Sequence, residues 1–365
     1  MAPHPMARRD LSSIQILRGL AAGLVVIAHV AEHADGISGN PVLITGRFGV
    51  DIFFVISGFI IAHISGDGPF DLKSFAIRRV FRVVPLYWAC TILVLALALI
   101  APALFKTTAA DIEQFFYSLA FLPHSVNGGT EWRPLFKLGW TLNYEMFFYL
   151  LTALLFWCGT AFLRATILSL VMGALVIAGL VFDLENTFVG FYANLNLMPF
   201  ILGFWLARMA GRPFFEHMSK PILASLWLVA IVLTAILYQT DFYALREVGG
   251  HTIMTLAALA IVTAGVASER YMVFPGSAWA RMIGDSSYSL YLLHMFIVGA
   301  AWAIVNRLDL GQAPALVLAM VIAVPTSLAA AYVSYRLFER PISNWANRRT
   351  RTPLPLRQSE VSAQR

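Results

Sequence analysis

The stretch IQILRGLAAGLVVIAHVAE, residues 14–32, decides the fold class. It is apolar and long enough to cross a bilayer, yet it carries Arg18 and His29. These residues are eleven positions apart, about three helical turns, so both side chains lie on one helix face at levels roughly 16 Å apart. Ionisable groups within a membrane usually face the bundle interior and mark functional sites. The alternative is that Arg18 snorkels to the headgroups and His29 is a satisfied core histidine.

Composition agrees with a membrane location. The 365 residues are 59% hydrophobic and only 13% charged, which is typical of a polytopic membrane protein and not of a soluble domain. The two cysteines, Cys90 and Cys158, lie in apolar stretches, so we expect packing roles and neither a disulfide framework nor a metal site. The net charge of +6 does not indicate nucleic acid binding, because no basic stretch is interleaved with base-stacking aromatics.

The hydropathy pattern predicts an all-α fold with about ten transmembrane helices. The predicted spans are residues 14–33, 48–66, 84–104, 138–158, 162–181, 190–209, 220–238, 251–268, 284–305 and 313–337.

The distribution of Lys and Arg predicts the orientation. Of the 26 Lys and Arg residues, 20 fall in the termini, in the loops after the second, fourth, sixth and eighth spans, or at helix ends bordering them. The positive-inside rule therefore predicts that both termini are cytoplasmic. The basic start MAPHPMARRD, followed by the apolar run, is expected to act as a retained signal anchor.

Two other regions stand apart from the spans. The connection 105–137 is unusually long and contains an apolar stretch, 115–122, which predicts an interfacial or re-entrant helix ending at Pro123. It would form a lid or part of an acceptor groove, or simply a surface loop held by its aromatics. We expect residues 1–345 to form the transmembrane domain and the basic segment 346–365 to be a disordered cytoplasmic tail.

Several motifs carry further polar candidates. KSFAIRRVFRVVPLYW contains Arg78, Arg79 and Arg82, which would bind an anionic group or merely set the topology. WTLNYEMFFYL places Asn143 and Glu145 inside an aromatic-rich helix, where a carboxylate is either paired or neutral and serves catalysis or pins two helices together.

Three more motifs complete the set. GVDIFFVISGFI contains Asp51, expected near the outer end of its helix, and Ser57-Gly58, expected to permit close helix packing. SYSLYLLHMFI carries Tyr288 and His294 on nearby turns, and FERPI closes the last helix.

The Arg-x10-His first helix and these motifs, in this order, resemble the membrane-bound acyltransferase-3 family over residues 12–345. Members of that family transfer acetyl or other short acyl groups to hydroxyls of polysaccharides, glycolipids and similar acceptors. The resemblance implies an acyl-CoA-dependent O-acyltransferase, with acetyl-CoA as the expected donor, in a bacterial inner membrane. No metal is implied.

The resemblance also implies roles for the polar candidates. Acyl-CoA would enter from the cytoplasm with its phosphates on Arg18, Arg78, Arg79 and Arg82. His29 would act as general base, oriented by Glu145, and an acyl-histidine relay remains open. Asp51, Asn143, Tyr288 and His294 are further candidates. The competing class is a transporter of a lipid-linked sugar or small anion, in which Arg18, His29 and Glu145 form a charge relay.

Overall fold

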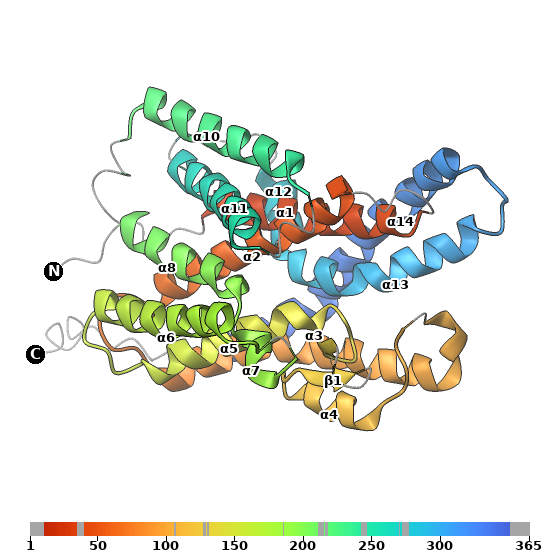
Figure 1. Cartoon of the computed structure of the whole chain (residues 1–365), viewed down its shortest axis with the longest axis horizontal. Helices are drawn as coiled ribbons and strands as arrows, with labels where there is room; N and C mark the ends of the chain where they lie inside the picture. Colours follow the sequence, from red (N-terminus) through yellow and green to blue (C-terminus); the bar gives the residue numbers. More distant parts are fainter. Residues whose placement is uncertain are drawn as a thin grey trace, which may run out of the picture.

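The structure is a computed structural model, and its described part is almost entirely helical (Figure 1). It describes residues 11–34, 40–105, 107–126, 129, 131–184, 186–210, 215, 218–241, 247–269, 271 and 277–350. The helices are α1 (Ser12–Glu32), α2 (Asn40–Ser65), α3 (Leu72–Ile100), α4 (Ile112–Leu119), α5 (Gly139–Leu154), α6 (Ala161–Val181), α7 (Phe188–Tyr192), α8 (Met198–Ala210), α10 (Lys220–Gln239), α11 (Val248–Ser268), α12 (Ser277–Asp285), α13 (Ser287–Val305), α14 (Gln312–Ser334) and α15 (Arg340–Arg349).

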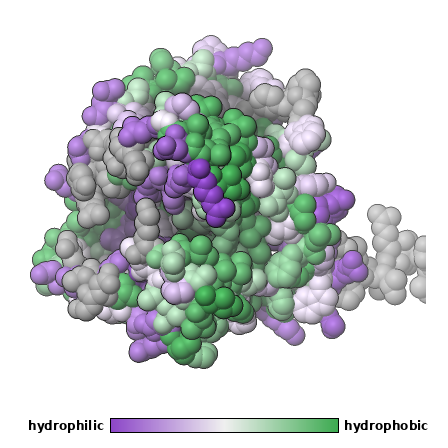
Figure 2. Space-filling model, turned by 90° about the vertical axis from the view of Figure 1, so that its right-hand side faces the viewer, coloured by the Kyte–Doolittle hydropathy of each residue, from purple (hydrophilic) through white to green (hydrophobic). Residues whose placement is uncertain are grey.

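The prediction of an all-α polytopic membrane protein is confirmed. Eight helices in the described ranges are long and apolar enough to cross a membrane. The other two predicted spans are also helical: one is α5, with 16 residues, and the other is the shorter apolar helix Leu195–Ala210. Large apolar side chains point outward on several helices, among them Ile100, Leu170 and Val321. Figure 2 shows extended hydrophobic areas on one end face of the molecule, beside hydrophilic ones.

Two helices begin earlier than predicted. α3 begins at Leu72 and not at residue 84, because the Asp71 carboxylate accepts hydrogen bonds from the backbone N–H groups of Lys73 and Ser74. Hydrogen bonds from the Ser74 side chain and backbone also hold the pKa of Asp71 below its usual value. The helix continues through Pro85, so Arg78, Arg79 and Arg82 lie in the first turns of α3, ahead of the predicted start at residue 84. Similarly, α2 begins at Asn40 and not at residue 48.

Helix α2 lies at the centre of the bundle and packs against α1 and α8. A Cβ atom on Gly58 would lie 2.1 Å from the carbonyl oxygen of Phe200, and one on Gly203 would lie 2.0 Å from that of Val55. The backbones of α2 and α8 therefore approach each other as only glycine allows. The predicted close helix packing is confirmed at Gly58.

The long connection before α5 has structure of its own. The predicted short helix is present as α4, and strands β1 (His124–Val126) and β2 (Glu131–Arg133) follow as an antiparallel pair with His124 opposite Arg133. The Trp88 indole N–H donates to the carbonyl oxygen of Leu119 at 2.9 Å, which ties this connection to α3.

The C-terminal segment corrects one expectation. Residues 346–349 were expected to be disordered, but α14 passes through a π-helical turn (Tyr335–Glu339) into α15. α15 is held because Trp345 packs on Phe81 with ring centroids 4.8 Å apart. The rest of the predicted tail, 351–365, and the predicted signal-anchor residues 1–10 lie outside the described residues.

Candidate active site

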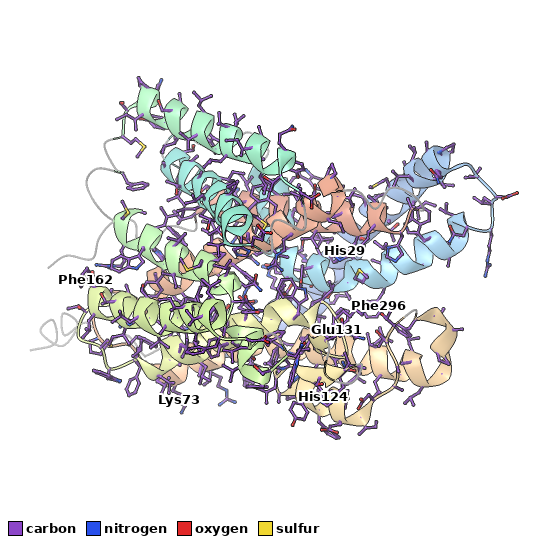
Figure 3. The ribbon with its side chains drawn as sticks, in the orientation of Figure 1. His29, Lys73, His124, Glu131, Phe162 and Phe296 are labelled. Atoms are coloured by element: carbon purple, nitrogen blue, oxygen red, sulfur yellow. The ribbon has the colours of Figure 1, made fainter. Side chains whose placement is uncertain are left out.

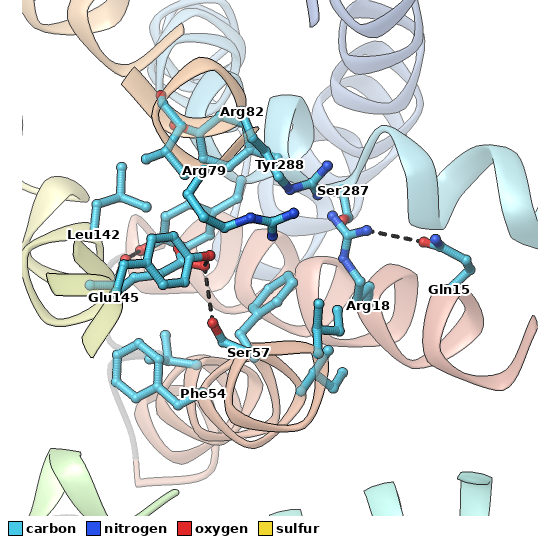
Figure 4. A pocket seen from close by; sticks show the side chains of 18 residues that line it. Gln15, Arg18, Phe54, Ser57, Arg79, Arg82, Leu142, Glu145, Ser287 and Tyr288 are labelled. Carbon is cyan, nitrogen blue, oxygen red and sulfur yellow. Dashed lines mark hydrogen bonds between the residues drawn. The ribbon is translucent and has the colours of Figure 1, made fainter. Parts of the chain in front are cut away.

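A cavity of about 260 Å³ lies between α1, α2, α3, α5 and α13. Figure 4 shows three guanidinium groups converging in it: Arg18 from α1 with Arg79 and Arg82 from α3. Arg18 is 8% exposed, and its guanidinium donates to Gln15 at 3.1 Å. We call this space the arginine cavity.

The arginine cavity has an excess of positive charge. Glu145 is the one acidic side chain that lines it, and no ion pair within 4 Å joins it to the three arginines among the described residues. The Nε atom of Arg79 is buried and has no hydrogen-bond partner among the residues that the structure describes. Three guanidinium groups against one lining carboxylate favour an anionic ligand, and planar guanidinium groups suit phosphate oxygens in particular.

Glu145 is held within this cavity by two neighbours. Its Oε1 accepts a hydrogen bond from Ser57 Oγ at 3.1 Å and another from the hydroxyl of Tyr149, one turn along α5. The sequence hypothesis coupled Glu145 to His29, but the structure places them in different cavities.

His29 lines a second, smaller cavity of about 140 Å³, which we call the histidine cavity. Glu32, Arg47 and Trp140 also line it. The Arg47 guanidinium lies 4.7 Å from the centre of the Trp140 ring and donates to Asn196. Arg18 and His29, on the predicted face of α1, therefore line two different cavities.

His29 is paired with His294 of α13. The Nδ1 atom of His29 lies 2.9 Å from the carbonyl oxygen of Val25 and 3.3 Å from Nε2 of His294. The Nδ1 atom of His294 lies 3.1 Å from the carbonyl oxygen of Leu290. A carbonyl oxygen only accepts, so we assign the proton of each neutral ring to Nδ1. The single Nδ1–H of His29 is then shared between the carbonyl oxygen of Val25 and Nε2 of His294, and Nε2 of His29 keeps a lone pair that accepts from none of the described residues.

The remaining candidates are distributed as follows. Arg78 is directed away from the arginine cavity, since its Nε donates to Thr350 Oγ1 at 2.8 Å. Tyr288 lines the arginine cavity and donates to the carbonyl oxygen of Val83 at 2.6 Å.

Asp51 is fully buried, lines neither cavity, and accepts from Thr255 at 3.0 Å. Asn143 is also fully buried, and its side-chain amide has no hydrogen-bond partner in the described part of the chain.

Some lining residues were missed from the sequence. Tyr149 could have been found, because it lies four residues after Glu145 and so on the same helix face. Arg47 and Trp140 gave no such signal, because they come from different helices and meet only through packing.

Figure 3 places several labelled residues along the long axis of the molecule. Figure 3 shows Phe162 and Lys73 toward one end, and His29, His124 and Glu131 nearer the middle. Lys73 belongs to a connection predicted to be cytoplasmic, and His124 and Glu131 belong to one predicted to be on the outer side.

A family model described as an acyltransferase domain matches residues 11–336. The chain belongs to the acyltransferase-3 family. This match covers nearly the whole chain and favours an acyltransferase over the competing transporter class.

Two relatives illustrate the breadth of the family. The exopolysaccharide production protein ExoZ of Rhizobium meliloti is 32% identical over 311 residues, covering 81% of this chain and 89% of that protein. The O-acetyltransferase OatA of Staphylococcus aureus is 30% identical over 366 residues, covering 92% of this chain. The chain spans only 57% of the length of OatA. No solved structure matches the chain.

The described residues also bear on metal binding. No group of three or more His, Cys, Asp or Glu side chains placed to hold a metal ion occurs among them.

Proposed function

We propose that this acyltransferase moves an acyl group, in the first instance acetyl, from acyl-CoA to a hydroxyl of a cell-surface polysaccharide or glycolipid. The observation that carries the proposal is the convergence of three guanidinium groups in a cavity next to the one that His29 lines. The similarity to an exopolysaccharide production protein and to an O-acetyltransferase supports the acceptor class. We place the enzyme in a bacterial inner membrane, with the donor entering from the cytoplasm.

The arginine cavity would bind the donor by its phosphates. Acyl-CoA carries a diphosphate and a ribose phosphate. One of these phosphates could accept a hydrogen bond from the buried Nε of Arg79, which has no partner among the described residues. Glu145, held by Ser57 and Tyr149, would orient the donor by accepting hydrogen bonds. The thioester would lie farther along α1, toward His29.

His29 would act as general base. The free lone pair on Nε2 accepts the acceptor hydroxyl proton while the hydroxyl oxygen attacks the thioester carbonyl. The carbon–sulfur bond then breaks, and the CoA thiolate takes a proton to leave as free CoA. The products are an ester and CoA.

His294 would act on His29 as a positioning residue. By sharing the Nδ1–H of His29 with the Val25 carbonyl oxygen, it would help to hold the tautomer in which Nε2 is the base, and it would orient the ring. The carbonyl oxygen of Val25, one turn earlier in α1, accepts a hydrogen bond from the same Nδ1.

The test uses purified protein in nanodiscs with acetyl-CoA and a crude glycan acceptor, following free CoA and acetylated product. We expect His29→Ala to lower the rate about 100-fold or more, the usual contribution of general base catalysis. His33→Ala is the matched control, because His33 is exposed, lies one turn away and lines neither cavity. It should stay within about twofold of wild type.

Two further outcomes bear on the proposal. The side-chain oxygen of glutamine can still accept from His29, so His294→Gln should keep more of the rate than His294→Leu does. If wild type neither binds nor consumes acetyl-CoA or succinyl-CoA, the donor assignment is wrong and the transporter becomes the leading hypothesis.

A further inference from the structure

The arginine cavity and the histidine cavity share two lining residues, Val50 of α2 and Tyr291 of α13. His29 lines only the histidine cavity, and the three arginines line only the arginine cavity. A donor whose phosphates lie among the arginines must therefore extend past Val50 and Tyr291 to bring its acyl group to His29.

Tyr291 is fixed in place from both sides of this boundary. Its hydroxyl lies 2.8 Å from Oγ1 of Thr141, which lines the arginine cavity. The hydroxyl also donates to the carbonyl oxygen of Leu138, a residue of the histidine cavity, at 3.1 Å. Phe53 packs against the Tyr291 ring edge to face, with centroids 6.0 Å apart. The ring cannot move aside without losing these contacts.

Val50 lines the same boundary from α2 and is also constrained. A Cβ on the preceding residue, Gly49, would lie 2.7 Å from the carbonyl oxygen of Ala21 and 2.9 Å from Val25. Helix α2 is thus pressed against α1 at this level and cannot retreat. Val50 is 6% exposed, and a β-branched side chain in a helix has essentially one χ1 rotamer.

We propose that Val50 and Tyr291 form a constriction that selects the acyl group by its size. This inference rests on the proposed function, because it assumes that acyl-CoA is the donor. A short group such as acetyl would pass two closely packed side chains, while each added methylene of a longer chain would have to displace one of them. Close-packed interiors resist such displacement.

The test compares acetyl-, propionyl-, butyryl- and hexanoyl-CoA as donors for the full chain in nanodiscs, by kcat/KM from CoA release. We expect wild type to prefer acetyl-CoA and Val50→Ala to raise the butyryl-to-acetyl ratio about tenfold, in the range that one or two methylenes are worth in an apolar site. Val50→Ile should lower the propionyl-to-acetyl ratio. Tyr291→Phe, which removes the hydroxyl contacts, should broaden the donor range in the same direction as Val50→Ala.

Val55→Ala is the matched control. Val55 is a fully buried valine on the same helix and lines neither cavity, so its truncation should leave the donor ratios unchanged. A ratio is insensitive to the fraction of folded protein, so a loss of stability does not obscure the result.

Three results would overturn the inference while leaving the proposed function in place. They are a wild type that uses hexanoyl-CoA as well as acetyl-CoA, Val50 variants whose ratios stay within about twofold of wild type, and a Val55→Ala change equal to that of Val50→Ala. A wild type that consumes none of the donors would overturn the proposed function as well.

Discussion

At the scale of single residues, two arginines one turn apart in α3, Arg78 and Arg82, have different surroundings. Arg78 and Arg82 are one turn apart, and both were expected to approach the same anion. Arg82 lines the arginine cavity, whereas Arg78 donates to the side-chain and backbone oxygens of Thr350. The difference depends on α15, which places Thr350 within reach of Arg78.

A paired substitution tests this assignment. Arg82→Ala should raise the KM for acetyl-CoA about tenfold or more, because a hydrogen bond to a charged group is worth about 1.5–3 kcal/mol. Arg78→Ala should raise it much less. Steady-state CoA release at varied acetyl-CoA concentration measures the KM of both variants. Equal increases in KM would mean that Arg78 also binds the donor.

At the scale of helices, the close crossing of α2 and α8 fixes the position of α2, which lines both cavities. α2 contributes Val50 and Ser57 to the cavity walls, so its distance from α8 affects both cavities. That distance is set by Gly58 and Gly203, where each helix meets the other's backbone.

We expect Gly58→Ala to destabilise the protein, because the new methyl group would overlap a backbone carbonyl that cannot move independently. Overpacking typically costs about 1–3 kcal/mol. Gly173→Ala on α6 is the control, since no atom lies within 4 Å of its added Cβ. Thermal unfolding in nanodiscs should show a lower midpoint for Gly58→Ala alone. Matching midpoints would mean that the two helices separate easily.

At the scale of the whole molecule, function depends on orientation. A donor from the cytoplasm and an acceptor from outside require the α1 end that carries Arg18 to face inward. The positive-inside rule predicts this orientation, because the loop that contains Lys73 is predicted to be cytoplasmic and the connection that contains His124 to be outside.

Cysteine labelling tests the orientation. Cys90 and Cys158 are buried and should give little background. Glu113→Cys on α4 should react with a membrane-impermeant maleimide in intact spheroplasts, while Lys73→Cys should react only after lysis; both positions are exposed. The reverse pattern would invert the topology and place the donor site outside.

The sequence by itself determined the fold class, the location of the helical spans and the face of α1 that carries Arg18 and His29. These depend on hydropathy and helical period, which are local properties of the chain. Sequence reasoning was less accurate at helix starts. The Asp71 cap and the continuation of the helix through Pro85 put the start of α3 at Leu72, whereas the prediction was residue 84.

Only the tertiary structure decided which side chains meet. It paired His29 with His294, placed Glu145 with Ser57 and Tyr149, and set Val50 and Tyr291 between the two cavities. These contacts join helices that are far apart in sequence. They depend on crossing distances set by residues such as Gly49, Gly58 and Gly203, and no periodicity within one helix specifies how it meets another.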